Sequence, residues 1–457
     1  MIDLQPLVNK NVPFKFKGAE LKLDLSHALF SSFNVDVGTR LLLKAVGRDE
    51  VLAGARRVLD AGSGVGVIGV AVAKAFPEAR VEARDRDLLA CAFTERNGAR
   101  NKAPNLLVRP GLLATGAAVS AAFPEPALPG GGYDFILSNL PAKAGGPVLE
   151  AFFKGAASLL APGGRLAVVI VKPLVEAALA WIEGAGLDIV SSERGSGHMA
   201  WVLAPRAAAP SQAGAAQVPA AAAPAQSQAA AASAPPQAGV PGAAQPVPAS
   251  APAEGPELDL SGLDLGVYLR RRGRFRLGEA SYEASGYWGL PDFDTVGFSP
   301  RVAVELAERA IAGTLVREAL VVNPGLGHFP LWLARRAGPA RIQAASRDLL
   351  SLAATGANLA ALAGRRPAYR ALDALRLDEL PSASLDLLAE FPDAVPEYDW
   401  IEPLWDRAFR LLKRGATFLL AATPTELARA EKRRPQGFRL LGDRRRKGQA
   451  AMAWRRD

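Results

Sequence analysis

The chain has 457 residues, 49% of them hydrophobic, so it is long enough for two or more domains that each bury a core. No apolar run reaches the roughly 20 residues that cross a bilayer, and the first residues lack the apolar core of a secretion signal. The single cysteine, Cys91, excludes an intrachain disulfide and argues against a thiolate metal cluster, so we expect a cytoplasmic protein without a metal or a membrane partner. The net charge of +9 favours polyanionic partners.

The pattern before residue 50 predicts a hairpin followed by a helix. PFKFKG (13–18) and LKLDL (21–25) alternate apolar with polar residues, as a half-buried hairpin does. Asp36 or Thr39 is placed to cap a helix over residues 41–46.

Strands and helices alternate from residue 58 onward. A loop over APGGR (161–165) is expected to lead into a strand over LAVVIVK (166–172). Such alternation predicts an α/β fold, with a mostly parallel sheet covered by helices on both faces.

A glycine-rich turn lies at the start of this alternation. In VLDAGSGVGVIG (58–69) an apolar strand ends at Asp60, the turn contains Gly62, Gly64 and Gly66, and an apolar helix begins immediately. Glycines let a ligand approach the backbone closely and permit positive φ in a strand-to-helix reversal. The turn therefore indicates a ligand held close to the backbone, with any dinucleotide-binding turn or an ordinary tight βα turn as the alternative interpretations.

Asp85 ends the next predicted strand, ARVEARD (79–85). A carboxylate at this position of a nucleotide-binding domain accepts hydrogen bonds from both ribose hydroxyls. Because Arg84, Arg86 and Asp87 flank it, a surface carboxylate in a charged run is the alternative. Asp60 either contacts the ligand through water or backbone, or caps the turn.

Asn139 closes a later strand, YDFILSN (133–139), and is followed by Leu140 and Pro141. The amide oxygen of Asn139 and the carbonyl of Leu140 offer two neighbouring acceptors, whose geometry Pro141 fixes. Two such acceptors hold a planar amine by its hydrogens and direct its lone pair at an electrophile. The alternative is an asparagine that only forms a turn.

Residues 207–253 differ in kind from the rest. They contain no charged residue and almost nothing large enough for a core, and frequent prolines interrupt the alanines. We expect a disordered Ala/Pro-rich linker over 207–256, joining one domain at 1–206 to a second at 257–457.

The second half repeats the first. RVEARDRDLLACAFTERN (80–97) aligns without gaps with RIQAASRDLLSLAATGAN (341–358), and two further blocks, 58–73 and 133–142, recur in the same order. The alignment pairs Asp60 with Asn323, Gly66 with Phe329, Asp85 with Ser346 and Asn139 with Glu390. The second copy is therefore expected to keep the fold and to lose the site.

Together, the blocks FSSFNVDVGTRLLL (30–43), VLDAGSGVGVIGVAVA, ARD and ILSNLPA resemble the small-domain class I S-adenosylmethionine methyltransferases, especially those that methylate guanine N2 in ribosomal RNA. The resemblance covers residues 14–204 well and 270–455 weakly, and implies two tandem Rossmann-like methyltransferase domains. It implies S-adenosylmethionine as cofactor. The expected cofactor-binding residues are Asp60, Gly62, Ser63, Gly64, Gly66, Asp85 (on the ribose), Arg86 and Asn139, and the expected catalytic residues are Asn139, Leu140 and Pro141.

Two features depart from that family. Its usual motif is Asn-Pro-Pro followed by an aromatic residue, whereas this chain has Asn139, Leu140, Pro141 and Ala142, which removes a stacking surface of about 1–3 kcal/mol. In addition, the degenerate copy usually comes first in the family, and here it comes second.

The sequence thus predicts an N-methyltransferase acting on an exocyclic amine of RNA, in which the second domain positions the RNA. Its arginine runs, at 270–276, 432–434 and 444–447, are expected to meet phosphates. The alternatives are a protein glutamine N-methyltransferase, which would use the same acceptor pair, and a non-catalytic RNA-binding pseudoenzyme. His27, His198 and His328 show no metal-ligand spacing.

Overall fold

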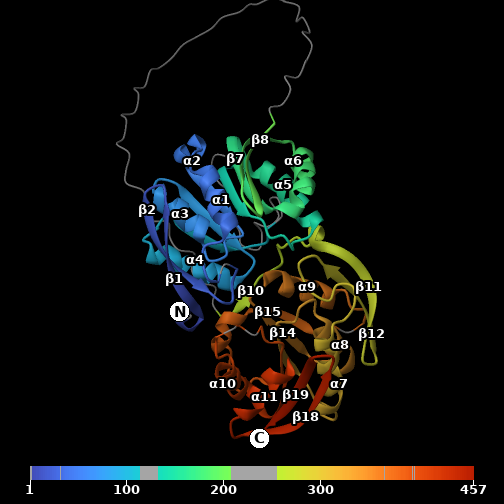
Figure 1. Cartoon of the computed structure of the whole chain (residues 1–457). Helices are drawn as coiled ribbons and strands as arrows, with labels where there is room; N and C mark the ends of the chain where they lie inside the picture. Colours follow the sequence, from blue (N-terminus) through green and yellow to red (C-terminus); the bar gives the residue numbers. More distant parts are fainter. Residues whose placement is uncertain are drawn as a thin grey trace, which may run out of the picture. The chain divides into compact units, whose positions relative to one another are not determined.

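The computed structural model describes residues 3–30, 32–113, 132–206, 255–364, 366–393, 395 and 397–457. We call residues 3–206 the amino-terminal lobe and residues 255–457 the carboxy-terminal lobe; Figure 1 colours the first blue to green and the second yellow to red. Apart from Gly255 and Pro256, the predicted linker at 207–256 lies outside the described residues.

The amino-terminal lobe is built on a seven-stranded sheet. In neighbour order its strands are β5 (Leu106–Pro110), β4 (Arg80–Asp85), β3 (Arg57–Ala61), β6 (Tyr133–Asn139), β7 (Leu160–Val171), β9 (His198–Pro205) and β8 (Leu187–Arg194). The first five are parallel, and β9 is antiparallel to both β7 and β8. The chain reverses its direction of strand addition between β3 and β6, which is where such sheets bind ligands.

Helices cover both faces of this sheet, as the sequence predicts. Alternate residues of the strands enter two separate cores: Val58 and Phe135 face one, and Leu59 and Ile136 face the other. The helices are α1 (Val37–Val46), α2 (Glu50–Gly54), α3 (Val67–Ala75), α4 (Leu88–Arg100), α5 (Gly146–Leu159) and α6 (Val175–Gly184), with short 3₁₀ turns at Gln5–Leu7 and Lys172–Leu174.

The predicted hairpin and cap are both present. Strands β1 (Val8–Phe16) and β2 (Ala19–Ser26) pair antiparallel. Asp36 caps α1, because its carboxylate accepts a hydrogen bond from the backbone N–H of Thr39. The helix begins directly after that cap and includes the predicted residues 41–46.

The prediction of a loop over APGGR (161–165) is wrong. Residues 161–165 lie inside β7, which pairs with β6 from Leu160 and shifts register before Arg165. Gly163 takes a positive φ of 78° there. The irregular stretch is thus an interruption of the ladder within one strand, and proline and glycine are compatible with strands at such irregularities.

The carboxy-terminal lobe repeats this architecture. Its eight-stranded sheet has the order β10 (Glu257–Leu258), β15 (Ala368–Asp373), β14 (Arg341–Ser346), β13 (Glu318–Val322), β16 (Leu385–Glu390), β17 (Leu412–Ala422), β19 (Gln449–Arg456) and β18 (Phe438–Arg446). The hairpin β11 (Leu269–Leu277) and β12 (Ala280–Tyr287) precedes it, after a 3₁₀ turn at Gly266–Tyr268. The helices are α7 (Phe298–Ala310), α8 (His328–Arg336), α9 (Leu349–Ala360), α10 (Ile401–Leu411) and α11 (Pro424–Lys432), with a 3₁₀ segment at Ala374–Glu379.

The structure corrects two pairings in the duplication. Gly62 and Asn323 both donate their backbone N–H to the neighbouring strand, to Arg84 and Ala345, so Gly62 corresponds to Asn323. Gly66 and Gly327 are likewise equivalent, since each is the left-handed residue that begins the following helix. The glycine block of the sequence alignment was therefore displaced by two residues.

The second correction concerns Asn139. Phe135 and Leu387 occupy the same place in the two sheets, because they pair with the equivalent residues Val58 and Ala319. Continuing along the two strands, Asn139 corresponds to Phe391, and Glu390 corresponds to Ser138. The apolar strand pattern tolerates such a displacement, so the alignment alone did not detect it.

Two equivalent turns, one from each lobe, contact each other. The N–H of Leu88 donates to the carbonyl of Arg347 at 2.8 Å, and the N–H of Leu349 donates to the carbonyl of Arg86 at 3.0 Å. The side chains form two equivalent ion pairs between the turns: Arg86 pairs with Asp348 at 3.4 Å, and Arg347 pairs with Asp87 at 3.4 Å. We call Arg86, Asp87, Arg347 and Asp348 the clasp.

Candidate functional site

A cavity of about 590 Å³ opens where β3, β4 and β6 end in the amino-terminal lobe. Its size is that of pockets that hold small molecules and cofactors. Of the residues expected from the sequence, it is lined by Gly62, Ser63, Gly64, Asp85, Arg86, Asn139, Leu140 and Pro141. Asp60 and Gly66 do not line it.

The glycine turn presents its backbone to this cavity. The N–H groups of Gly62 and Ser63 both donate to the carbonyl of Arg84, at 2.8 and 2.9 Å, which ties the turn to β4. Gly62 and Gly64 have φ of 82° and 57°, a region that other residues rarely adopt. A Cβ atom added at Gly64 would meet no atom within 4 Å, so this part of the backbone faces open space.

Gly66 has a structural role in the same turn. It begins α3 with φ of 84°, and a Cβ atom there would lie only 2.9 Å from the side chain of Thr94. The position thus needs glycine because α3 and α4 approach closely.

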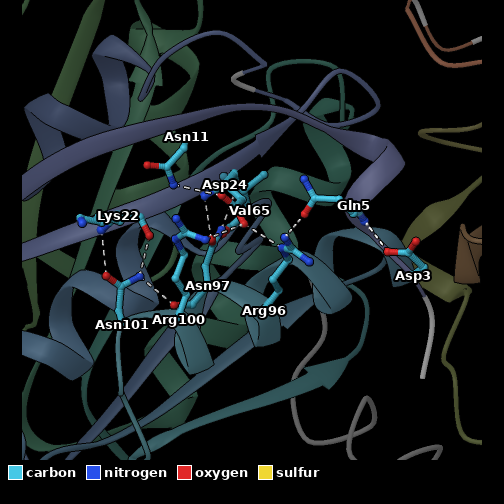
Figure 2. A network of polar contacts seen from close by, with 10 residues as sticks. All are labelled: Asp3, Gln5, Asn11, Lys22, Asp24, Val65, Arg96, Asn97, Arg100 and Asn101. Carbon is cyan, nitrogen blue, oxygen red and sulfur yellow. Dashed lines mark hydrogen bonds and ion pairs between the residues drawn. The ribbon is translucent and has the colours of Figure 1, made fainter.

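A buried amide anchors the turn from behind, as Figure 2 shows. Asn97 donates to the carbonyl of Val65 at 2.8 Å and to that of Asp24 at 3.0 Å, while its Oδ1 accepts from the N–H of Asp24 at 2.8 Å. The carboxylate of Asp24 in turn accepts from Arg96 at 2.7 Å. Strand β2, the glycine turn and α4 are therefore held as one unit beneath the cavity.

The carboxylate of Asp85 is fixed by two backbone groups. Its Oδ2 accepts from the N–H of Gly64 at 2.9 Å, and its Oδ1 accepts from the N–H of Asp87 at 2.9 Å. Each oxygen retains a further lone pair for a ligand. Burial raises the pKa of Asp85, against the two hydrogen bonds and the charge of Arg86, which lower it.

Asp60 does not line the cavity, and its side chain contacts the helix that follows the glycine turn. It is fully buried, and its Oδ2 accepts from the N–H of Gly69 at 2.8 Å inside α3. Burial and the charge of Asp85 together raise the pKa of Asp60 to about 7, against the hydrogen bond from Gly69, which lowers it. Asp60 thus stabilises the first turn of the helix, and its predicted place among the cofactor contacts has no support in its side-chain geometry.

Asn139 is held by residues from the loop and helix that precede the glycine turn. Its Nδ2 donates to Oδ2 of Asp36 at 3.1 Å and to Oγ1 of Thr39 at 3.0 Å. Because a carboxylate can only accept, the amide cannot be turned round without placing two acceptors against each other. The amide Oδ1, which receives no hydrogen bond from a described residue, is therefore left as an acceptor for a ligand.

The residues after Asn139 form a tight turn at the cavity edge. The N–H of Leu140 donates to the carbonyl of Val169 at 3.1 Å, and the N–H of Ala144 donates to the carbonyl of Pro141 at 3.0 Å. The Leu140 side chain is buried, whereas Pro141 and Ala142 are exposed. The backbone here is thus fixed at both ends of the motif.

Among the other residues that line this cavity, the sequence did not indicate Phe30, Asp36, Thr39 and His198 as site residues. Asp36 and Thr39 were recognised only as capping residues, and their contact with Asn139 joins segments about 100 residues apart. The exposed aromatic Phe30 within the FSSFN block was the one available signal.

At the equivalent place in the carboxy-terminal lobe, residues of the lobe bond to one another. Asn323, the counterpart of Gly62, donates to the carbonyl of Phe391 at 3.2 Å and accepts from Ser346 at 3.3 Å. These three residues replace Gly62, Asp85 and Asn139. Next to them, Glu390 is buried and forms a two-point ion pair with Arg407, with both distances 2.8 Å.

Comparison with known proteins defines the class. Residues 20–180 match the family model described as methyltransferase small domain. The match covers this part of the chain, and the cofactor of methyltransferases of this class is S-adenosylmethionine.

The sequence is similar to ribosomal RNA methyltransferases over this domain. It is 33% identical over 154 residues to the ribosomal RNA small subunit methyltransferase C of Hahella chejuensis, covering 33% of this chain and 40% of that one. It is 32% identical over 151 residues to the ribosomal RNA large subunit methyltransferase G of Streptomyces avermitilis, covering 32% and 36%. The matches thus span less than half of either relative.

The fold is similar over nearly the whole length to one solved structure. This is the 16S rRNA N2 G1207 methyltransferase of T. thermophilus in complex with AdoMet and guanosine, with a TM-score of 0.61, 17% identity, and 99% of both chains covered. Two tandem Rossmann-like methyltransferase lobes are therefore the fold of this chain, as predicted.

Within the described ranges, no helix is long and apolar enough to cross a membrane. In the same residues, no group of three or more His, Cys, Asp or Glu side chains is arranged to hold a metal ion.

Proposed function

We propose that this protein transfers a methyl group from S-adenosylmethionine to an exocyclic amine of RNA, with guanine N2 of ribosomal RNA as the target. The observation that carries the proposal is the fixed orientation of Asn139, whose amide oxygen is presented to the same cavity as the carboxylate of Asp85. The relatedness to ribosomal RNA methyltransferases supports the choice of substrate.

The residues present suit S-adenosylmethionine. The backbone of Gly62 and Gly64 leaves room for a ligand to approach, and Asp85 would accept hydrogen bonds from its ribose. Ser63 and Arg86 line the same cavity beside them. When bound, the cofactor supplies an electrophilic methyl group.

The chain supplies orientation at the target amine. Oδ1 of Asn139 and the carbonyl of Leu140 would each accept one N–H of the exocyclic amine, which holds the nitrogen lone pair toward the methyl group. The methyl group would come from the sulfonium of the bound cofactor, and the methylated amine, still held by Asn139 and Leu140, would release its extra proton to water. No strong base is required, because the amine becomes acidic only once it carries the methyl group.

The carboxy-terminal lobe would contact RNA phosphates with fewer arginines than its sequence indicates. Arg270 and Arg271 both pair with Asp294, at 3.2 and 3.3 Å, and Arg444 and Arg446 both pair with Glu305, at 2.6 and 2.9 Å. Within the described residues, three exposed arginines on β11 have no ion-pair partner. They are Arg272, Arg274 and Arg276, whose alternate positions place them on one face of the strand.

Nucleotide mass spectrometry of ribosomal RNA tests the proposal. RNA from cells with and without the gene should differ by one methylated guanine, and purified full-length protein should restore that methyl group in vitro. Transfer to a glutamine of a protein fraction, with no change in RNA, would instead establish the glutamine methyltransferase. Binding of RNA with no transfer to either would establish the pseudoenzyme.

A further inference from the structure

One large apolar side chain in the cavity wall is exposed without an evident structural reason. Phe30 lies in the loop between β2 and α1, lines the cavity that contains Asn139, and is 70% exposed. A ring that is exposed and also lines a cavity is available to a ligand that occupies the cavity, and covering it would gain the free energy of burial.

The loop that carries Phe30 is held in place on both sides. Before it, the N–H of Leu29 donates to the carbonyl of Ser26 at 3.2 Å; after it, the hydroxyl of Ser32 donates to the carbonyl of Leu29 at 3.0 Å. Asn9 of β1 donates to the carbonyl of Ser32 at 2.6 Å. The exposure of Phe30 therefore belongs to an anchored loop.

The same loop continues into the residues that orient the amide. Asp36, six residues beyond Phe30, accepts from Nδ2 of Asn139 at 3.1 Å. The aromatic ring and the amide acceptor are thus linked through one short segment. The turn after Asn139 has no aromatic of its own, because Pro141 and Ala142 follow Leu140.

We propose that Phe30 forms the stacking face for the target base, so that the ring holds a purine while Asn139 and Leu140 hold its exocyclic amine. This inference extends the proposed function by locating the base. Enzymes that act on a base remove it from the helical stack and hold its face against aromatic or apolar side chains. Every base offers such a face, so the ring contributes affinity and the acceptors contribute selection of the amine.

Phe33 provides a matched control. It lies in the same loop, is 67% exposed, does not line the cavity, and contacts the ring of His27 edge-on at 5.5 Å. Replacing it removes a similar exposed ring from a similar place. A general effect of exposed aromatics would therefore appear in both variants.

The experiment compares Phe30→Leu, Phe30→Trp and Phe33→Leu in the full-length chain. With S-adenosylhomocysteine present, guanosine is titrated by calorimetry. We expect Phe30→Leu to weaken guanosine binding about 5- to 100-fold, the range for one lost base–aromatic contact, while Phe30→Trp and Phe33→Leu stay within about 3-fold of the parent. Affinity for S-adenosylhomocysteine alone should not change in any variant.

Failure of this inference is distinct from failure of the proposed function. If Phe30→Leu binds guanosine as the parent does, or the parent binds none, the stacking role is overturned, whatever the RNA methylation assay gives. If guanosine binding depends on Phe30 but the parent methylates no RNA, the stacking role of Phe30 is supported and the proposed RNA methyltransferase activity is refuted.

Discussion

The two lobes share a framework and differ in almost every group that faces the cavity. Both keep a left-handed glycine before the helix, Gly66 or Gly327, and both pack it against a threonine, Thr94 or Thr355. Both also use a buried asparagine, Asn97 or Asn358, to join the hairpin to the turn. These groups satisfy the backbone of the fold, so they are needed whether or not a ligand binds.

The groups that differ have changed together. Asp36 and Thr39, which hold Asn139, correspond to Gly297 and Pro300, since Arg40 and Arg301 make the same bond one turn into their helices. Asn139, which these two residues hold, corresponds to Phe391 in the second lobe. Without an amide at this position, the second lobe has no group that residues like Asp36 and Thr39 would hold.

A second linked change involves the buried carboxylate. Asp60 accepts from the N–H of Gly69, and the equivalent residues are Val321 and Pro330. Proline has no N–H, so the second lobe removes the donor and the acceptor at once and avoids a buried charge. Asp60 therefore stabilises the start of the helix, and its buried carboxylate requires the N–H of Gly69 as a donor.

The largest expected effect follows from changing Asn139. Asn139→Ala should lower kcat/KM for methyl transfer by at least about 100-fold, because the amine loses an oriented acceptor. Affinity for S-adenosylhomocysteine should change by less than about 5-fold. Phe391→Leu at the equivalent place is the control and should retain activity; an equal loss there would contradict the assignment of catalysis to the first lobe. Single-turnover transfer assays measure both variants.

Asp85→Asn tests the prediction that the amino-terminal lobe binds the cofactor and the carboxy-terminal lobe does not. The charged hydrogen bonds proposed for Asp85 predict that S-adenosylhomocysteine binds about 10- to 100-fold more weakly to the variant, measured by calorimetry. Ser346→Ala alters the counterpart in the second lobe and should leave affinity within about 2-fold. Unchanged affinity in Asp85→Asn would contradict its proposed place on the ribose.

Asp60→Asn should alter the pH dependence of stability. The carboxyl has a pKa of about 7 when folded against 3.8 as its ordinary value, so between these pH values the folded chain binds a proton that the unfolded chain does not. Its contribution is therefore complete below about pH 4 and is lost as pH rises through 7. Relative to the parent, the variant should gain on the order of 2–4 kcal/mol in the free energy of unfolding from pH 4 to pH 8.

Asp386→Asn provides a control of opposite sign for that measurement. Burial opposes its ionisation, but hydrogen bonds from Lys413 and from two backbone N–H groups outweigh this and lower the pKa of Asp386. Its stabilisation is present above the ordinary pKa and is lost as pH falls through the lowered value. Chemical denaturation across pH should therefore show opposite trends, and parallel trends would refute the role of burial at Asp60.

The smallest expected effect concerns the clasp. Arg347→Gln removes the ion pair with Asp87 and the hydrogen bond to the carbonyl of Ala28, at 2.9 Å. The backbone bonds of the clasp remain, so we expect only about 2- to 5-fold weaker binding of S-adenosylhomocysteine, through the loop that follows Asp85. Arg444→Gln, which breaks an exposed pair with Glu305, should have no effect on binding.

Much of the fold could be predicted because its signals are local. The glycine turn, the alternation of strands and helices, and the hairpin all depend on residues close in sequence. The pairing of the two copies was less secure, since Val58 and Leu59 resemble many apolar neighbours and the strand pattern repeats every two residues. Hydrogen bonds to Arg84 and Ala345 settled that pairing.

Residue patterns were enough to predict the α/β class, the duplication, and the presence of Asp85 and Asn139 at the ends of strands. The folded chain was needed to see that Asp36 and Thr39 orient the amide, that Asp60 faces a helix, and that several arginine runs are already paired. The cause is the distance along the chain over which each feature is specified. A strand or turn is specified by its own residues, whereas the direction of a side chain is set by partners that folding brings from distant parts of the chain.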